Sequence, residues 1–412
     1  THGVMERCNL ACTSCYLTDI ANATRPLPFA EVRQQLDRLR RFLGPAGKAQ
    51  ITSGEVTLLP VEQLGRIVAY ARAIGLDPMV MSNGVRFIES PGYLATLMRV
   101  YGLEKISIHI DTTQRGRKGL REGATEEEIH PIRERFAALI RDLRARTGRK
   151  LHAAHTLTVT RENYDQIPAI MRWVLDNADA FRMVSFQPTA EIGRTHNRRI
   201  DGLTLDAVWQ KVCAGAGRSL NRHAVHFGHP ECNILSTMLV ASFGGRHEII
   251  ETVRRDNRWD LRMMRRILDE FGGFRARASG PIERAVRLIS MLLQNPGFLL
   301  EAPLYGLYRL WGIRAWLPAA LAHLLAFRAV RLRPLVVVVH KFMSRDELET
   351  PLGRERLQAC SFKLPVNGKM VSMCEMNATP LRRELNHTLR LHRLIVATRG
   401  KGKDEIKLPA RS

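Results

Sequence analysis

Residues 7–16 read Arg-Cys-Asn-Leu-Ala-Cys-Thr-Ser-Cys-Tyr, and this stretch decides how the rest of the chain is interpreted. Cys8, Cys12 and Cys15 have a CxxxCxxC spacing, tight enough for one loop to wrap a single metal cluster. Three thiolates can hold three irons of a [4Fe–4S] cluster and leave the fourth iron open for a ligand. A zinc site would usually need a fourth Cys or His nearby, and three clustered cysteines leave one without a disulfide partner. The motif therefore predicts an iron–sulfur cluster.

The same run, Tyr16 included, resembles the cluster-binding loop of the radical S-adenosylmethionine (SAM) superfamily. The resemblance implies that the open iron binds the amino and carboxyl groups of SAM. One electron would then cleave SAM and release a 5′-deoxyadenosyl radical. Cys8, Cys12 and Cys15 would be the catalytic metal ligands, Tyr16 would lie beside the cofactor, and a low-potential donor such as ferredoxin or flavodoxin would supply the electron.

Composition limits the other possibilities. The chain has 412 residues, enough for more than one domain, and an ordinary hydrophobic fraction of 45%. Its formal charge of +23 suggests an anionic partner: nucleic acid, a membrane surface or a phosphorylated substrate. Seven cysteines with three clustered suit a reducing compartment, so we expect a cytoplasmic protein. The chain begins at Thr1, close to the motif and without a signal-peptide pattern, and we expect residues to precede it.

Strand-like and helix-like segments alternate through the N-terminal half. Strands are expected at 2–6, 48–52, 78–82, 105–110, 151–159 and 182–187, and helices at 31–43, 61–74, 93–101, 126–146 and 166–177. This alternation predicts an α/β fold with a parallel sheet, curved into a partial (β/α)6 barrel. In such barrels the chemistry lies at the C-terminal ends of the strands.

Polar residues follow these strands, as a cofactor site would require. Thr52-Ser53-Gly54-Glu55 is similar to a Gly-Gly-Glu motif that binds the SAM amino group, with Ser53 in place of the first Gly and Val56 where Pro is common. Gly54 would let the backbone approach a ligand closely. Taken alone, Ser82-Asn83-Gly84 also fits an ordinary turn. The residues expected to bind the cofactor are Tyr16, Ser53, Gly54, Glu55, Ser82, Asn83, Asp111, Thr158 and Gln187.

Arg115 and Arg117 follow the fourth strand in a basic, Gly-containing loop. The loop is either a solvated surface or a clamp for a phosphate or carboxylate head group of the substrate.

Four more cysteines lie in the second half. Cys360 and Cys374 flank an expected hairpin with its turn at Asn367-Gly368, so they should lie close together. With Cys232 they would form a second three-thiolate set for an auxiliary [4Fe–4S] cluster, although they could also be separate buried cysteines. Cys213, in an expected helix, is either a fourth ligand or a core residue.

This layout resembles the radical SAM enzymes that join or modify membrane lipid tails, the tetraether lipid synthases and their bacterial relatives. The shared features are the cluster loop, a His-Pro-x-Cys element, a late Cys, a Gly-turn hairpin and then Cys-x-x-Asn. The resemblance implies hydrogen abstraction from an unactivated carbon of a lipid chain, with carbon–carbon coupling as one outcome.

The segment 254–333 contains fifteen Arg and no Lys against six acidic residues, and strongly apolar runs lie between them. Amphipathic helices of this composition lie in the membrane interface, a depth that also suits Trp311 and Trp316. No run reaches the about 20 residues needed to span a bilayer. We therefore expect peripheral attachment to an anionic membrane surface; an ordinary helical domain with a basic surface is the alternative.

The expected organisation is a barrel at 1–195, a mostly helical, basic and lipid-facing region at 196–340, and a cysteine-containing β-hairpin region with a basic tail at 341–412. A peptide-modifying radical SAM enzyme with an auxiliary cluster is the alternative function. No recognisable nucleic-acid-binding module is present, so no nucleic-acid partner is expected.

Overall fold

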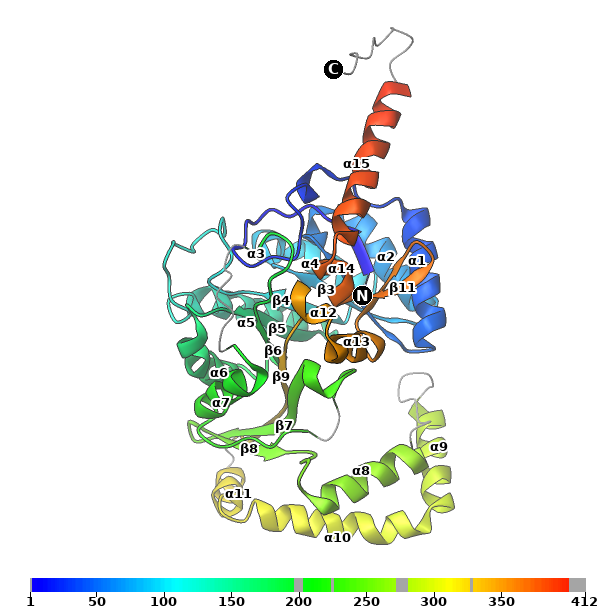
Figure 1. The fold of residues 1–412 in the computed structure, drawn as a ribbon. Helices are drawn as coiled ribbons and strands as arrows, with labels where there is room; N and C mark the ends of the chain where they lie inside the picture. The colour runs from blue at the N-terminus through cyan, green and yellow to red at the C-terminus, as the bar shows by residue number, and fades with distance from the viewer. Residues whose placement is uncertain (1, 196–202, 224–225, 272–280, 327–328, 400–412) are drawn as a thin grey trace.

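The computed structural model describes residues 2–195, 203–223, 226–271, 281–326 and 329–399. In this part of the chain, nine strands form one sheet in the order β1-β2-β3-β4-β5-β6-β9-β7-β8, and β10 and β11 form a separate hairpin (Figure 1). The expected basic tail falls on residues 400–412, outside the described residues. The expected domain boundary falls between residue 195, which is described, and residue 196, which is not.

The strands are β1 (His2–Met5), β2 (Lys48–Ser53), β3 (Asp77–Ser82), β4 (Lys105–His109), β5 (His152–Val159), β6 (Phe181–Pro188), β7 (Asn233–Phe243), β8 (Arg246–Glu251), β9 (Arg331–His340), β10 (Lys363–Val366) and β11 (Lys369–Ser372). The α-helices are α1 (Phe29–Leu43), α2 (Val61–Ala73), α3 (Val85–Glu89), α4 (Pro91–Arg99), α5 (His130–Thr147), α6 (Ile167–Asp176), α7 (Leu205–Gly215), α8 (Arg258–Phe271), α9 (Pro281–Gln294), α10 (Pro296–Gly312), α11 (Leu317–Leu325), α12 (Arg345–Leu348), α13 (Pro351–Gln358), α14 (Met373–Ala378) and α15 (Leu381–Arg399). Short 3₁₀ turns lie at Ala21–Ala23, Val56–Leu58, Tyr164–Gln166 and Pro230–Cys232.

Strands β1 to β6 pair in parallel in chain order, which confirms the predicted α/β fold. The intervening helices bury one apolar face against the sheet. In α6, for example, Ile167, Ile170, Met171 and Val174 recur at helical spacing and are fully buried. The strand ends that the sequence marks with polar residues therefore meet at one edge of the sheet.

The sheet continues beyond the sixth strand. Strand β9 pairs in parallel with β6, and β7 and β8 follow it in antiparallel pairing. Strands β7 and β8 were not predicted, because 233–251 was included in the mostly helical region. Region 196–340 thus contributes three strands to the same sheet as well as helices α7 to α11.

Helices α8 to α11 form an arm between β8 and β9 that lies at one end of the molecule, beyond the sheet (Figure 1). One contact of the arm with the sheet is made just before α11, where Trp316 packs on Phe243 of β7 with ring centroids 5.8 Å apart. Trp316 is therefore part of this contact, whereas Trp311 is exposed. Among the described residues, no helix is both long and apolar enough to cross a membrane.

The C-terminal segment returns to the beginning of the chain. Hairpin β10–β11 turns at Asn367 and Gly368, both with positive φ, as predicted, and β10 lies against α1 and β1. Helix α15 then leaves the body at the end opposite the arm (Figure 1).

Candidate active site

The three N-terminal cysteines lie on the loop that follows β1, and all three line a cavity of about 230 Å³ at the C-terminal ends of the strands. Loop amides of Ala11 and Thr13 donate hydrogen bonds of 2.9 Å to the loop after β4, which fixes the cysteine loop over the barrel. No disulfide involves Cys8, Cys12 or Cys15, so their thiols are available as ligands.

The surroundings of these thiols fit a thiolate-bound cluster. Burial raises the pKa of the Cys8 and Cys12 thiols, and Cys15 raises both further, so without a metal they stay protonated. A bound metal deprotonates such thiols. Arg194 lowers the pKa of both Cys8 and Cys12, and its buried Nε has no hydrogen-bond partner among the described residues. A cluster held by thiolates would place negative charge near this guanidinium.

In the described part of the chain, no three His, Cys, Asp or Glu side chains already stand together in an arrangement that would hold a metal ion. This concerns a single ion, and each cysteine set still lines one cavity.

Gly54 lines the cavity, and it is also required by a close backbone contact within the protein. A Cβ at this position would lie 2.2 Å from Arg7 O and 2.4 Å from Glu6 O. The Gly54 amide also donates to Met5 O at 2.6 Å. Glycine at 54 thus allows the end of β2 to pack against the start of the cysteine loop.

Ser53 has a φ of 122°, a conformation that glycine adopts more readily than serine. Its hydroxyl donates to the Glu6 carboxylate and accepts a 3.0 Å hydrogen bond from Arg382 Nη1. Its carbonyl accepts from the Tyr16 hydroxyl, and Tyr16 itself lines the cavity. Ser53 is therefore held by Glu6, which follows β1, and by Arg382 of α15.

Glu55, Ser82 and Asn83 come together, as the sequence predicted. The Glu55 carboxylate is buried, accepts from Ser82 Oγ at 2.8 Å through Oε1, and accepts from the Asn83 amide at 2.7 Å through Oε2. Thr57 donates to Oε1 as well. Oε2 accepts only this one hydrogen bond from the described residues, and Glu55 lines the cavity, so its carboxylate suits an ammonium group.

Asp111 does not line the cavity, although the sequence placed it among the cofactor ligands. It is completely buried, and its Oδ2 contacts His109 Nε2 at 2.6 Å and accepts from the Thr158 amide at 2.6 Å. Burial alone would raise the pKa of Asp111, but His109 together with hydrogen bonds from Thr113 and Thr158 holds it well below its ordinary value. His109, which the sequence analysis did not select, occupies the cavity wall instead.

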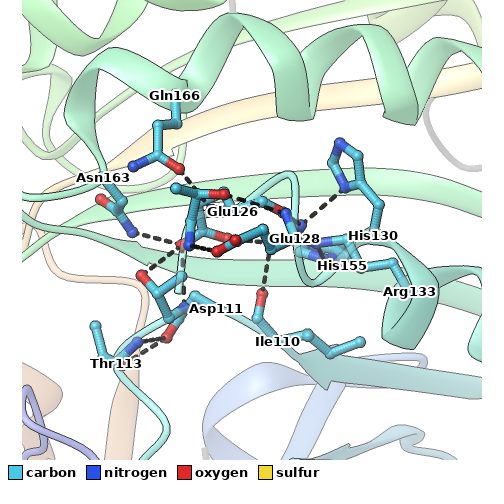
Figure 2. A network of polar contacts seen from close by, with 12 residues as sticks. Ile110, Asp111, Thr113, Glu126, Glu128, His130, Arg133, His155, Asn163 and Gln166 are labelled. Atoms are coloured by element: carbon cyan, nitrogen blue, oxygen red, sulfur yellow. Dashed lines mark hydrogen bonds and ion pairs between the residues drawn. The ribbon is translucent and has the colours of Figure 1, made fainter. Parts of the chain in front are cut away.

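A buried ion pair fixes the loop that carries Asp111 (Figure 2). Glu126 and Arg133 are both fully buried and paired, and Glu126 Oε1 also accepts from the Thr112 amide at 3.0 Å and from Asn163 Nδ2 at 2.8 Å. Arg133 Nε donates to His155 Nε2 at 3.1 Å. Helix α5 was predicted to begin at 126, but it begins at His130. Glu126 therefore precedes the helix, and its side chain holds the loop that carries Asp111.

Thr158 and Gln187 line the cavity at the ends of β5 and β6, as predicted. The arginine loop differs from the expected clamp. Arg117 is buried, and its guanidinium donates to Gln114 Oε1 at 2.8 Å and to the Asn83 carbonyl, so it supports the cavity wall from behind. Arg115 is exposed and pairs with Glu122 at 3.0 Å, outside the cavity lining.

Cys232, Cys360 and Cys374 line one small pocket, which brings together residues far apart in sequence. Arg356 Nε lies 3.4 Å from Cys232 Sγ, and burial raises the pKa of the Cys374 thiol to about 12. The pocket volume is about 10 Å³, room for roughly one water molecule, so a cluster there would require neighbouring side chains to move. The three thiols are suitable metal ligands, but the pocket that they line is too small to hold a cluster.

Cys213 is not part of this set. It lies on α7, where its sulfur accepts from the Leu220 amide at 3.4 Å, and it lines a different pocket. Arg194, His109 and Arg382 are the functional candidates that the sequence analysis missed. Only His109 had a sequence signal, since it lies near the end of a predicted strand, two residues before Asp111.

Comparison with known proteins agrees with this geometry. Residues 3–174 match the family described as the radical SAM superfamily, so the N-terminal part of the chain is a radical SAM domain, the catalytic module of iron–sulfur enzymes. The match covers β1 to α6, the elements that carry the cysteine loop and most of the cavity.

The chain is also similar to a Methanocaldococcus jannaschii protein named 7,8-dihydro-6-hydroxymethylpterin dimethyltransferase. The two are 25% identical over 207 residues, which is 48% of this chain and 37% of the relative. The chain thus spans little more than a third of the relative's length. The relative's name concerns methyl transfer and not lipid joining, so the resemblance to lipid-joining enzymes stays an expectation.

Proposed function

We propose that this radical SAM enzyme cleaves SAM reductively and abstracts hydrogen from an unactivated carbon of a membrane lipid chain. A [4Fe–4S] cluster held by Cys8, Cys12 and Cys15 would supply one-electron cleavage of bound SAM, and a low-potential protein such as ferredoxin or flavodoxin would be the donor. The protein supplies binding, orientation and exclusion of water. The observation that carries the lipid assignment is the apolar part of the cavity wall.

The radical SAM domain holds the cofactor end of the cavity. Cys8, Cys12 and Cys15 provide the thiolates, and Glu55 Oε2 provides an acceptor for the SAM ammonium group. Tyr16, held by the Ser53 carbonyl, closes one side of this region. Thr158 and Gln187 are polar wall residues that can hydrogen-bond to the ribose or carboxylate of SAM.

The substrate end is built largely by the second half of the chain. Its cavity-lining residues are Phe227, Val338, His340, Phe342, Phe362 and Met373, apolar except for His340. Met79, Met81 and Met183 add flexible thioethers from the barrel strands. A wall of this kind excludes charged head groups and favours hydrocarbon, because polar groups buried there would lack hydrogen-bond partners.

The cavity must enlarge to hold both molecules. Its volume of about 230 Å³ is below the range of about 300 to 1,000 Å³ typical of ligand pockets. The methionine side chains can change rotamer at little cost, so they are the expected adjustable part. Cys232, Cys360 and Cys374 lie beside the same wall. The proposal includes an auxiliary [4Fe–4S] cluster at these cysteines, with no part in the hydrogen abstraction assigned to it.

The proposal is tested by incubating reconstituted protein with SAM, a strong reductant and phospholipid. We expect more 5′-deoxyadenosine than in the lipid-free reaction, and a mass change in the acyl chains that separates coupling, desaturation and methylation. Phe362→Gln should lose most of the lipid stimulation but keep lipid-free SAM cleavage, whereas Val100→Gln, at an exposed position, should behave as the parent. Stimulation by peptides but not by lipid would replace this proposal with the peptide-modifying alternative.

A further inference from the structure

The arm α8–α11 presents rows of apolar side chains to solvent, while several of its polar side chains contact one another or the rest of the protein. Along α10, Leu300, Leu304, Leu307 and Trp311 recur at helical spacing and are 74%, 56%, 63% and 67% exposed. A soluble helix normally has the opposite arrangement, with its apolar stripe buried. Contiguous apolar surface of this kind marks an interaction site.

The polar side of α10 is already used within the arm. Glu301 pairs with Arg262 and Arg266 of α8, the second at 2.8 Å, and Tyr305 donates to Asp260 at 2.9 Å. Arg309 reaches back to the Thr252 carbonyl at 2.8 Å. These contacts determine which face of α10 packs on α8, so the outward position of the leucine stripe is a consequence of the fold.

Helix α9 repeats the arrangement. Ile282, Val286, Ile289 and Leu293 have the same spacing and are all exposed. Leu321, Leu324 and Leu325 of α11 are exposed as well. Most of the large hydrophobic side chains exposed on the described residues lie on this arm, and they are largely aliphatic, with Trp259 and Trp311 as the tryptophans.

Charge identifies the class of partner. The segment 254–333 has fifteen Arg against six acidic residues, within a chain of formal charge +23. Arg255, Arg258 and Arg265 are exposed and make no ion pair with a described residue, and Arg314 stacks on Trp311 at 4.6 Å. Aliphatic stripes with tryptophan and arginine at their edges match the hydrocarbon and phosphate layers of a lipid surface.

We propose that α8–α11 is a membrane-docking arm whose apolar stripes enter the interface of an anionic lipid surface. No described helix is long and apolar enough to cross a bilayer, so the arm lies in the interface plane. The proposal concerns a surface separate from the cavity and does not require lipid to be the substrate. A protein partner and a second copy of this chain are the competing occupants.

Flotation of the full chain with vesicles tests the arm. We expect binding to phosphatidylcholine vesicles that contain about 30% phosphatidylglycerol, and much weaker binding to phosphatidylcholine alone or at about 0.5 M salt. The variant Leu300→Gln, Leu304→Gln, Leu307→Gln should reduce the partition coefficient by about tenfold or more, because three exposed leucines lose their burial in the interface. These side chains contact solvent in the fold, so thermal unfolding should change little.

The matched control is Val100→Gln with Leu352→Gln, exposed hydrophobics on the body of the molecule, which should leave vesicle binding unchanged. The variant Arg255→Gln, Arg258→Gln, Arg265→Gln should remove most of the salt-sensitive part. Equal vesicle binding by the leucine variant and the parent would overturn the proposal. So would conversion of a dimer to a monomer by the leucine variant in light scattering without any loss of vesicle binding, since the stripe would then be a self-association surface.

Discussion

Arg382 of α15 donates to both carboxylate oxygens of Glu6 at 2.8 Å, although 376 residues separate the two in sequence. The guanidinium is almost completely buried, also donates to Asn377 Oδ1, and lies 4.9 Å from the centroid of the Tyr16 ring. The C-terminal helix is therefore joined to the residue that follows the first strand and to the wall of the cavity that the three N-terminal cysteines line. Truncation of the C-terminal segment would affect the cofactor site directly.

Arg382→Met should destabilise the protein by about 3–5 kcal/mol, because it leaves the Glu6 carboxylate largely buried without its cation. Chemical denaturation measures this change. Arg383→Met is the matched control, since the neighbouring Arg383 pairs with Asp19 at 3.3 Å while more than half exposed. Its effect should stay within about 1 kcal/mol. Equal effects of the two variants would show that the Glu6 contact contributes little.

Two variants of Ser53 allow the free-energy effects of backbone strain and of side-chain hydrogen bonding to be measured separately. Both Ser53→Ala and Ser53→Gly lose the hydroxyl contacts to Glu6 and Arg382, but only glycine relaxes at a φ of 122°. We expect Ser53→Gly to be more stable than Ser53→Ala by about 1 kcal/mol, with both below the parent. If Ser53→Gly exceeded the parent in stability, the hydroxyl contacts would be weaker than the strain.

The sequence predicted the barrel closely because its strands are short apolar segments separated by amphipathic helices, a pattern with one physical solution. It failed at β7, whose residues Asn233–Phe243 are mostly buried without regular alternation. Such a run does not distinguish a central strand from a buried helix. The strand is recognisable only from its pairing with β9, which lies about ninety residues later in the chain.

The residues of the candidate site also fall into two groups: those that the sequence could place and those that it could not. Residues chosen by position in a motif, such as Cys8, Glu55 and Gln187, reach the cavity because a strand end places them there. Asp111 and Arg117 do not, because neighbouring polar groups satisfy them behind the wall. The role of Arg382 could not have been predicted, since nothing local to α15 indicates that its partner is Glu6, just after β1. Long-range side-chain pairing depends on the finished fold.

Glu126→Gln should destabilise the protein strongly, by about 3–5 kcal/mol, since Arg133 would remain buried without a counter-charge. Asp142→Asn removes the acid of an exposed helical pair with Arg146, at 2.6 Å, and should cost less than about 1 kcal/mol. Thermal and chemical unfolding of both variants compare the buried and the exposed pair. A mild effect of Glu126→Gln would mean that water enters this region.

His155 predicts a pH dependence of stability. The side chain is fully buried, and burial, with Arg133 next to it, lowers its pKa well below the ordinary value of 6.5. The folded protein therefore keeps His155 neutral, while the unfolded chain takes up a proton below pH 6.5. This contribution is fully present above that pH and is lost as the pH falls, by up to about 1.4 kcal/mol per pH unit.

His155→Gln keeps an acceptor for Arg133 Nε and should reduce the slope of unfolding free energy against pH between about 5 and 6.5 by close to one proton. The slope is the readout, because the absolute stability falls for packing reasons as well. His387→Gln, at an exposed position on α15, should leave the slope unchanged. Identical slopes for parent and His155→Gln would show that His155 is protonated in the fold or hardly shifted.

Iron content distinguishes the two cysteine sets. Anaerobically reconstituted protein should bind about eight irons if both sets hold [4Fe–4S] clusters. Replacing Cys8, Cys12 and Cys15 with Ala should remove about four irons and abolish 5′-deoxyadenosine formation. Replacing Cys232, Cys360 and Cys374 should remove the other four or so while SAM cleavage continues, because the first set is intact. Cys213→Ala is the control and should lose no iron, since Cys213 lines a different pocket. Unchanged iron in the Cys232, Cys360 and Cys374 variant would reduce these three to buried thiols and leave the N-terminal cluster as the sole metal centre of the proposal.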